Sequence, residues 1–262
     1  MINNIYEIIE SIGFNYNDNY WQRFVSDSDS VIPAIILDCQ KRAYDMYEVE
    51  LLPSDDSHKL FCVSQSFLSI DKNFEHGTIY HKDKDDAGIY GCAMVALYGN
   101  LIRKKTLVIH SSLVEIDGSG ILFTGPSGVG KTTQAELWHK HRNAEIINGD
   151  MSIIHLEQNE KFYAYGSPWH GSSEYCLNRK VPLKAIIAPI QSNRNSIKQI
   201  SGIEMLNRVF PEVMLPDWFE GCKEYGMDTL DSMLRNIPVY LLECTKDEQA
   251  VEIAEKELGK LN

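Results

Sequence analysis

The sequence lacks the features that mark several common classes of protein. Its 262 residues include 25 basic and 37 acidic side chains, which give a net charge of −12. Proteins that bind nucleic acid usually gather an excess of lysine and arginine to neutralise phosphates, so this charge balance argues against a nucleic-acid partner. No run approaches the roughly 20 apolar residues that a membrane-spanning helix needs, and we expect no role in a membrane.

Paired cysteines and a targeting segment are also missing. The six cysteines are scattered, with no CxxC motif. This spacing is typical of small buried side chains in a reducing compartment, and not of a disulfide framework or a metal site. The first residues, MINNIYEIIESIG, lack the basic stretch and long apolar core of a secretion signal, and we interpret residues 5–12 as a short amphipathic helix. Together these absences predict a cytoplasmic protein.

What is present indicates a globular chain with two regions. Hydrophobic residues make up 44% and charged residues 24% of the sequence, as in ordinary folded domains. Residues 1–87 alternate strand-like stretches, at 31–39 and 59–70, with polar segments, and they contain no catalytic pattern. We expect them to form a β-rich accessory region. Residues 88–262 are expected to form a nucleotide-binding domain that begins with a buried helix over 88–103.

A phosphate-binding loop is the most specific motif in the chain. Two apolar runs flank the glycine-containing turn at 117–120 and predict a β-hairpin. The second run leads into GPSGVGKT at 125–132, which matches the pattern G-x-x-x-x-G-K-[ST]. In such a loop Lys131 reaches the β- and γ-phosphates, and Thr132 offers its hydroxyl to Mg²⁺. The expected nucleotide-binding residues are Gly125, Ser127, Gly128, Val129, Gly130, Lys131, Thr132 and Thr133.

The rest of the chain predicts an α/β fold with a mixed sheet at its core. Strands and helices are expected in the order helix from Lys131, strand 145–156, strand 161–166, strand 181–190, helical segment 203–235 with two prolines, strand 237–244 and helix 246–258. Guanine-reading NKxD and transporter-type LSGGQ motifs are both missing, which argues against a GTPase and a transporter ATPase. The domain is also too small and too β-rich for most helicases. A kinase that uses ATP and Mg²⁺ is the leading interpretation.

A family resemblance supports this interpretation. The stretch 107–154 resembles the catalytic domain of HPr kinase/phosphorylase, whose fold is shared with phosphoenolpyruvate carboxykinase. Segments 166–171, 181–195 and 237–244 are similar to smaller, stand-alone HPr-kinase-like proteins associated with peptide modification, some of which phosphorylate serine. The resemblance implies a mixed sheet carrying the phosphate loop and phosphate transfer from ATP. Residues 1–85 do not resemble the N-terminal domain of true HPr kinases.

The resemblance also implies roles for individual residues. His110 matches a histidine close to the phosphates, Lys131 the catalytic lysine, and Asp150 the acid that binds Mg²⁺. Taken alone, His110 reads equally as a hydrogen-bonded strand histidine, and Asp150 as an acid at a strand end. The family's first acid, the base that accepts the proton of the substrate hydroxyl, is replaced by Gly149. Thr133 stands where the family has another acid, which counts against the reverse, phosphorylase reaction.

Several other residues are weaker candidates. Trp169 and His170 lie in a loop between glycines, where they either line an acceptor pocket or simply pack. Arg194 and Asn195 follow the strand at 181–190, where a cation could contact the γ-phosphate. Arg208 and Arg235 are alternative cations. Surface salt bridges explain these arginines equally well.

Three functions remain open from the sequence. The first is an ATP-dependent kinase that phosphorylates a hydroxyl, most simply serine, on a peptide or small protein such as a modified-peptide precursor. The second is a kinase for a small molecule, for example free serine. The third is a nucleotide-binding regulatory protein that has lost catalysis, which the glycine at position 149 favours. The sequence leaves a homo-oligomer open.

Overall fold

The chain divides into two compact units. The computed structural model describes residues 4–16, 18–28, 30–41, 57–83 and 85–259. The first unit comprises the chain up to Lys104 together with residues 218–220, and the second comprises Lys105–Asp217 and the chain from Gly221 onward. The expected boundary after residue 87 differs from this division, because helix α1 (Asp86–Leu101) packs against the strands of the first unit. Helices and mixed sheets together make an α+β protein.

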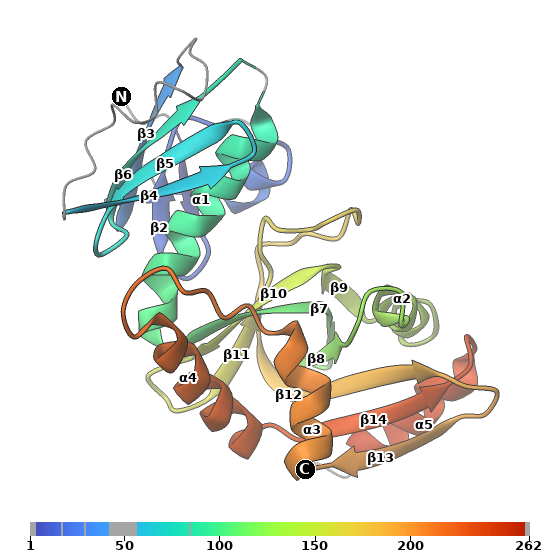
Figure 1. Ribbon diagram of the computed structural model, residues 1–262. Helices are drawn as coiled ribbons and strands as arrows, with labels where there is room; N and C mark the ends of the chain where they lie inside the picture. Colours follow the sequence, from blue (N-terminus) through green and yellow to red (C-terminus); the bar gives the residue numbers. More distant parts are fainter. Residues whose placement is uncertain (1–3, 17, 29, 42–56, 84, 260–262) are drawn as a thin grey trace. The chain divides into compact units, whose positions relative to one another are not determined.

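The first unit contains a six-stranded sheet in the order β1-β2-β3-β6-β5-β4 (Figure 1). Its elements are β1 (Ile5–Glu7), β2 (Ser11–Gly13), η1 (Trp21–Phe24), β3 (Ile35–Lys41), β4 (His58–Val63), β5 (Ser66–Asp71), β6 (His76–His81), α1 and η3 (Ile102–Lys104). The strand-like stretches of the sequence are thus confirmed as β3 and as the β4–β5 hairpin, whose strands pair antiparallel. The first unit is β-rich, as expected.

The amphipathic helix expected over residues 5–12 is wrong. Strands β1 and β2 pair antiparallel there, with Tyr6 opposite Ile12. Tyr6 packs its ring 5.1 Å from that of Trp21, and Trp21 lies 5.0 Å from Phe14. This aromatic cluster outweighs the local helical spacing, because large rings buried together stabilise more than helix propensity does.

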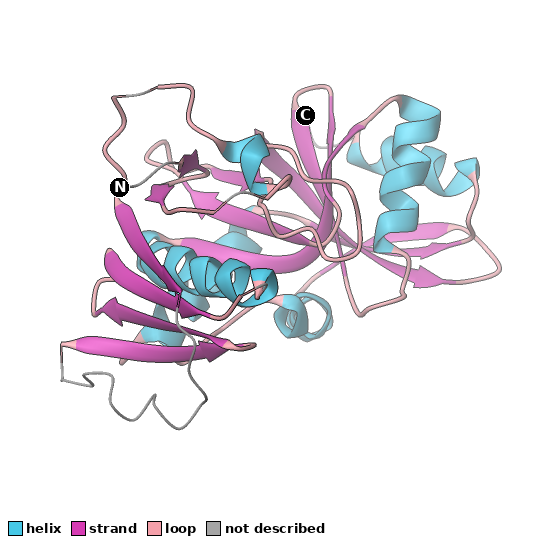
Figure 2. Cartoon of the chain, turned by 90° about the horizontal axis from the view of Figure 1, so that it is seen from above, coloured by secondary structure: helices cyan, strands magenta, loops and turns pink. Residues whose placement is uncertain are grey.

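Helix α1 lies across one face of the first sheet (Figure 2). The sequence predicted a buried helix here, and eleven of its sixteen residues are buried. Asp85 caps its N-terminus and accepts hydrogen bonds from the Gly88 backbone N–H at 3.2 Å and the Ser66 hydroxyl at 2.6 Å. The cap ties the start of the helix to β5.

The second unit contains an eight-stranded mixed sheet in the order β11-β10-β7-β8-β12-β14-β13, with β9 paired to β7 (Figure 1). Its elements are β7 (Thr106–Ile116), β8 (Ser119–Thr124), α2 (Lys131–Arg142), β9 (Glu145–Asn148), β10 (Met151–Leu156), β11 (Phe162–Tyr165), β12 (Lys180–Gln191), β13 (Ser196–Ile200), α3 (Gly202–Val209), η4 (Phe210–Glu212), α4 (Cys222–Asn236), β14 (Val239–Cys244) and α5 (Glu248–Leu258). The predicted hairpin is confirmed as the antiparallel pair β7–β8.

Two features of the second unit differ from the sequence interpretation. The strand expected over residues 145–156 is broken after Asn148 into β9 and β10, and the break exposes Asp150 at a turn. Strand β13 was not expected; its alternating polar residues pair antiparallel along β14 at the edge of the sheet. A solvated edge strand carries too few apolar residues for its pattern to stand out.

Alternating residues of the central strands build two separate cores. Leu122, Ile186 and Leu241 pack in one cluster with residues of α3 and α4. Their neighbours Phe123 and Ile187 pack on the opposite face, in a cluster with α2 and α5. Side chains of a strand alternate between the two faces of a sheet. Because both faces are buried here, successive residues of these strands are all apolar. The sheet is covered on both faces, and the glycine-rich loop at 125–130 follows the carboxyl end of β8.

Strands β8, β12 and β14 run parallel to one another. In parallel sheets, ligands bind at the carboxyl ends of the strands. The loop at 125–130 follows β8 directly, and Gln191 at the end of β12 donates a hydrogen bond to the Gly128 carbonyl at 3.0 Å. Among the described residues, no helix is long and apolar enough to cross a membrane.

Candidate active site

The phosphate loop has the backbone that the glycine pattern requires. Gly125, Gly128 and Gly130 adopt φ angles of +142°, +78° and +115°. L-residues with a Cβ rarely adopt such angles. Helix α2 begins directly after the loop at Lys131, so the N-terminal end of its dipole faces the same hollow. The loop thus has the positive φ angles and the following helix that the glycine pattern predicted.

Lys131 is held against the loop in this structure. Its Nζ donates hydrogen bonds to the carbonyl oxygens of Gly125 at 2.8 Å and Pro126 at 3.3 Å. Burial lowers the pKa of the Lys131 ammonium, while the charges of Glu212 and Asp150 act to raise that pKa. The cation therefore lies near two carboxylates, although its hydrogen bonds go to backbone oxygens.

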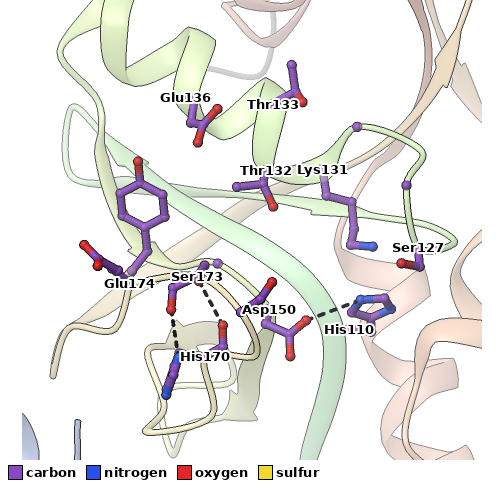
Figure 3. Close-up of a pocket in the computed structure, with 15 residues that line it drawn as sticks. His110, Ser127, Lys131, Thr132, Thr133, Glu136, Asp150, His170, Ser173 and Glu174 are labelled. Carbon is purple, nitrogen blue, oxygen red and sulfur yellow. Dashed lines mark hydrogen bonds and ion pairs between the residues drawn. The ribbon is translucent and has the colours of Figure 1, made fainter. Parts of the chain in front are cut away.

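Ser112 links Thr132 to the turn that carries Asp150. Its hydroxyl lies 3.4 Å from the Thr132 hydroxyl and donates a hydrogen bond to the Gly149 carbonyl at 3.2 Å. Ser112 is fully buried in β7, so this position is fixed by the sheet. Figure 3 shows the side chains of Thr132 and Asp150 facing one hollow, with Lys131 and His110 beside them.

Asn148 shapes the turn at Asp150. Its side-chain oxygen accepts hydrogen bonds from the backbone N–H groups of Asp150 and Met151, both at 2.9 Å. Its amide nitrogen donates to the carbonyls of Ser167 at 3.0 Å and Trp169 at 3.1 Å. The Asn148 amide is fully buried and its hydrogen bonds hold it in one position. It therefore joins the Asp150 turn to the loop at 167–170.

The imidazole of His110 lies between two carboxylates. Its Nδ1 is 2.9 Å from Oε2 of Glu212, and its Nε2 is 3.5 Å from Oδ1 of Asp150. The Glu212 side chain is 9% exposed, so its carboxylate is shielded from water. His110 and Asp150 were both predicted as site residues, and the structure brings them together.

Glu212 was missed by the sequence interpretation. It lies in η4, within a segment read only as helical, and 102 positions separate it from His110. Its place is set by the next residues, because Val213 forms an antiparallel bridge with Ile109 and the Met214 N–H donates to the Val108 carbonyl at 2.9 Å. No local pattern signals such a long-range pairing. Ser112 had a weak signal, as the last of three consecutive polar residues, His110 to Ser112, within an apolar strand.

His110, Lys131, Thr132 and Asp150 line one cavity of about 580 Å³. The residues that line it are His110, Ser127, Gly128, Gly130, Lys131, Thr132, Thr133, Glu136, Gly149, Asp150, His170, Ser172, Ser173, Glu174 and Tyr175. All predicted site residues are among them except Gly125 and Val129, which shape the loop from behind; a Cβ at Gly125 would lie 3.3 Å from Cγ1 of Val129.

The turn over residues 170–173 fills the space beside Gly149. A Cβ placed on Gly149 would lie 2.1 Å from Oγ and 2.7 Å from Cβ of Ser173. Gly171, at φ +60°, packs against the Asp150 carboxyl; a Cβ there would lie 2.6 Å from its Cγ. The position that the resemblance assigns to a catalytic acid is therefore occupied by the side chain of Ser173.

The weaker candidates lie apart from the described cavity lining, His170 excepted. Trp169 is half-buried and is held through its backbone by Ser167 and Asn148. Arg194 pairs with Glu243 at 3.1 Å, and Arg235 with Asp231 at 2.8 Å. Among the described residues, Arg194, Asn195, Arg208 and Arg235 contribute nothing to that lining. For Arg194 and Arg235 the surface salt bridge is the arrangement observed.

The oxygen atoms of Thr132 and Asp150 suit Mg²⁺, an ion that proteins usually bind together with water and substrate phosphates. In the described part of the chain, no cluster of three or more His, Cys, Asp or Glu side chains could hold a metal ion. The Thr132 hydroxyl and the Asp150 carboxylate face the same cavity and are linked through Ser112. Mg²⁺ is usually bound by one or two such oxygens together with water and substrate phosphates, so these residues fit that ion.

Comparisons with known proteins include a distant likeness to a solved structure. No protein-family model matches the chain, and no curated protein does so either. Among solved structures, the HPr(Ser) kinase/phosphatase from Coxiella burnetii is similar over 59% of this chain and 97% of its own, with 11% sequence identity and a TM-score of 0.36. The likeness is distant.

Proposed function

We propose that this protein is a kinase that transfers the γ-phosphate of ATP to a hydroxyl, a serine side chain on a peptide or small protein. One observation carries the proposal. The phosphate loop, with Lys131 and Thr132 at the start of α2, shares a cavity of about 580 Å³ with Asp150 and His110. A phosphate-binding loop that faces an acid and a histidine combines anion binding with groups that can act on a hydroxyl.

The loop supports binding of the triphosphate. Its glycine-permitted backbone turns N–H groups toward the hollow, as anion-binding nests do. On binding, the ammonium of Lys131 exchanges the carbonyls of Gly125 and Pro126 for phosphate oxygens. A cation that holds the phosphates through the transfer stabilises the charge that develops on them.

The acid side of the cavity supports the transfer step. Thr132 and Asp150 would hold Mg²⁺, whose positive charge would stabilise the negative charge on the phosphate oxygens. His110 is oriented by Glu212 through Nδ1, so its Nε2 faces the cavity beside Asp150. An incoming hydroxyl that enters the cavity beside Asp150 meets this imidazole, which accepts its proton directly or through water.

A second function has one observation in its favour. The side chain of Ser173 fills the space beside Gly149, where the resemblance implies a catalytic base. A nucleotide-binding regulatory protein that has lost catalysis accounts for this filling equally well. Positioning and charge stabilisation supply most of phosphoryl-transfer catalysis, so we retain the kinase as the leading proposal.

Incubation with Mg·ATP and candidate acceptors tests the proposal. We expect serine-containing peptides to gain one phosphate by mass, and the Lys131→Ala variant to gain none. A regulatory protein would bind a fluorescent ATP analogue and leave every acceptor unmodified. Transfer to free serine but not to peptides would identify a small-molecule kinase.

A further inference from the structure

The turn that closes the cavity carries a hydroxyl of the protein itself. Ser173 lines the same cavity as Lys131, Thr132 and Asp150. It is half-buried, whereas its neighbour Ser172 is exposed. Figure 3 shows the turn facing the start of α2 across the hollow. The cavity therefore joins the phosphate-binding side to a serine of this chain.

The absence of a side chain at position 149 brings that hydroxyl into the site. A Cβ on Gly149 would lie 2.1 Å from Oγ of Ser173, so the hydroxyl occupies the volume that any other residue at 149 would fill. Asp150 follows directly in the chain, and Gly171 of the same turn packs on its carboxyl. The turn that carries the Ser173 hydroxyl thus packs on the carboxylate that we propose to hold Mg²⁺.

The hydroxyl is held in a fixed place by the turn. It donates a hydrogen bond to the His170 carbonyl at 2.9 Å, and the Ser173 N–H donates to the same carbonyl at 3.1 Å. The His170 ring closes the turn with a bond from Nδ1 to the Ser173 carbonyl at 2.7 Å. The Gly149 N–H donates to the Tyr175 carbonyl at 3.2 Å and ties the segment to the end of β9.

This arrangement leaves the oxygen able to act as a nucleophile. A serine hydroxyl has one proton and two lone pairs, and the bond to the His170 carbonyl uses only the proton. A nucleophile that is already positioned avoids the entropic cost of bringing an acceptor into the site. The chain itself therefore supplies an acceptor hydroxyl in the cavity that the phosphate loop also lines.

We propose that Ser173 is a site of self-phosphorylation, in which the protein transfers the γ-phosphate of ATP to its own turn. The inference rests on the proposed kinase function. Oγ of Ser173 forms the new bond to the γ-phosphorus, the bond between that phosphorus and the oxygen of ADP breaks, and the hydroxyl proton passes to water. The products are ADP and a phosphoserine at position 173.

The product changes the site electrostatically. A phosphoserine carries a charge of about −1.5 to −2 near neutral pH. Here that charge lies on the turn that packs on Asp150, and Glu174 follows in the chain, so repulsion favours a turn displaced from the cavity. Displacement opens the space beside Gly149, where a separate acceptor would then enter.

The experiment is phosphate mapping on the intact chain. Purified, phosphatase-treated protein is incubated with Mg·ATP, digested and analysed by tandem mass spectrometry. We expect phosphate on Ser173, formed at a rate per molecule that is independent of protein concentration. The Ser173→Ala and Lys131→Ala variants should remain unmodified. The matched Ser172→Ala variant should be modified like the wild type, and thermal unfolding checks that each variant is folded.

The other possible results overturn the self-phosphorylation of Ser173, the kinase proposal, or both. If phosphate reaches an added peptide while Ser173 stays unmodified, self-phosphorylation is wrong and the kinase proposal stands. If ATP is hydrolysed and neither Ser173 nor an added acceptor gains phosphate, both the inference and the kinase proposal fail. Phosphate found on Ser172 instead, or a rate per molecule that rises with protein concentration, also overturns the inference. If no variant and no acceptor consumes ATP, both the inference and the kinase proposal fail.

Discussion

Glu212 and His110 form a hydrogen-bonded pair across 102 positions of sequence, with Oε2 2.9 Å from Nδ1. The shielded carboxylate fixes which ring nitrogen faces the cavity. A ring without this partner can rotate away from the reacting hydroxyl. The pair is thus the part of the site on which proton handling most depends.

We expect Glu212→Gln to lower the turnover of Mg·ATP about 10²-fold, at the low end of what a positioned base contributes. Affinity for ATP should change little, because Glu212 acts through His110 and not on the phosphates. The matched control is Glu252→Gln on the exposed face of α5. In a His110→Asn background the Glu212 change should have no further effect. An equal loss in both backgrounds would show that Glu212 does not act through the ring.

Lys131 makes nucleotide binding sensitive to alkaline pH. Burial lowers the pKa of its ammonium in the protein below the ordinary value of about 10.4. Below the lowered pKa the side chain is charged and phosphate affinity is complete; as the pH rises through that pKa, the charge and the affinity are lost. Titration with a fluorescent ATP analogue in the absence of Mg²⁺ measures the decline. Lys131→Arg should give a flat profile over the same range, since arginine stays charged up to a pH of about 12. A wild-type profile as flat as that of the variant would contradict the prediction.

Asp150 should determine the dependence of binding on Mg²⁺. Its carboxylate shares the cavity with the Thr132 hydroxyl. We expect Asp150→Asn to weaken binding of Mg·ATP about tenfold or more, as loss of a charge-assisted contact does. Metal-free ATP should bind the variant at least as well as the wild type, because a negative charge near the phosphates is gone. A parallel loss in both titrations would make the residue structural.

Gly149 and Ser173 should be energetically coupled. Because a Cβ at 149 would lie 2.1 Å from Oγ of Ser173, we expect Gly149→Ala to destabilise the protein by about 1–3 kcal/mol, the usual cost of overpacking. Ser173→Gly should relieve most of this cost, and Ser172→Gly, the matched control, should relieve none of it. Urea unfolding of the single and double variants gives the coupling energy. Additive effects of the Gly149 and Ser173 changes would contradict the contact. Gly149→Asp, made to restore the missing acid, should likewise need Ser173→Gly beside it.

Asp85 should make the first unit sensitive to acid. Burial acts to raise the pKa of this carboxyl, but hydrogen bonds from Ser66, Ser64, Gly88 and Gln65 outweigh it, and the net shift is downward. The stability that this shift provides is complete above the unfolded pKa of about 3.9 and is lost as the pH falls through the lower folded value.

We expect Asp85→Asn to cost about 1–3 kcal/mol at neutral pH, as unsatisfied buried donors do. The gap between variant and wild type should be smaller in acid than at neutral pH, because protonation of the wild-type carboxyl removes the charge that the hydrogen bonds stabilise. Urea unfolding at the two pH values measures it. A gap of the same size at both would show that the charge of Asp85 is not what stabilises the cap.

Local sequence patterns predicted the parts of the fold that depend on a few consecutive residues. The phosphate loop, the hairpin before it and the helix after Lys131 each follow from a few consecutive residues, because glycine conformation and strand alternation act locally. The helix over 88–103 followed from its apolar content. The expected helix at 5–12 was wrong because its residues pack against Trp21, which lies outside any local window.

The candidate site was predictable only in part for the same reason. Glu212 reaches His110 through pairing of Val213 with Ile109, and Ser173 reaches Gly149 through a turn that depends on Asn148 and Tyr175. Neither relation leaves a trace in sequence spacing. The roles assigned to His110, Lys131 and Asp150 stay predictions until the variants are measured.

The contact between Gly149 and Ser173 also limits how this protein can change over generations. An acid cannot arise at position 149 by one substitution without a steric clash, and a glycine at 173 gains nothing while position 149 lacks a side chain. The two codons are therefore expected to change as a pair. Among descendants of a common ancestor, lineages with a carboxylate at 149 should carry a smaller residue, or a displaced turn, at 173. A lineage that changed from glycine at 149 with serine at 173 to an acid at 149 with a smaller residue at 173 would have passed through a less stable protein with only one of the two changes. Each pair of residues should therefore persist once it is established.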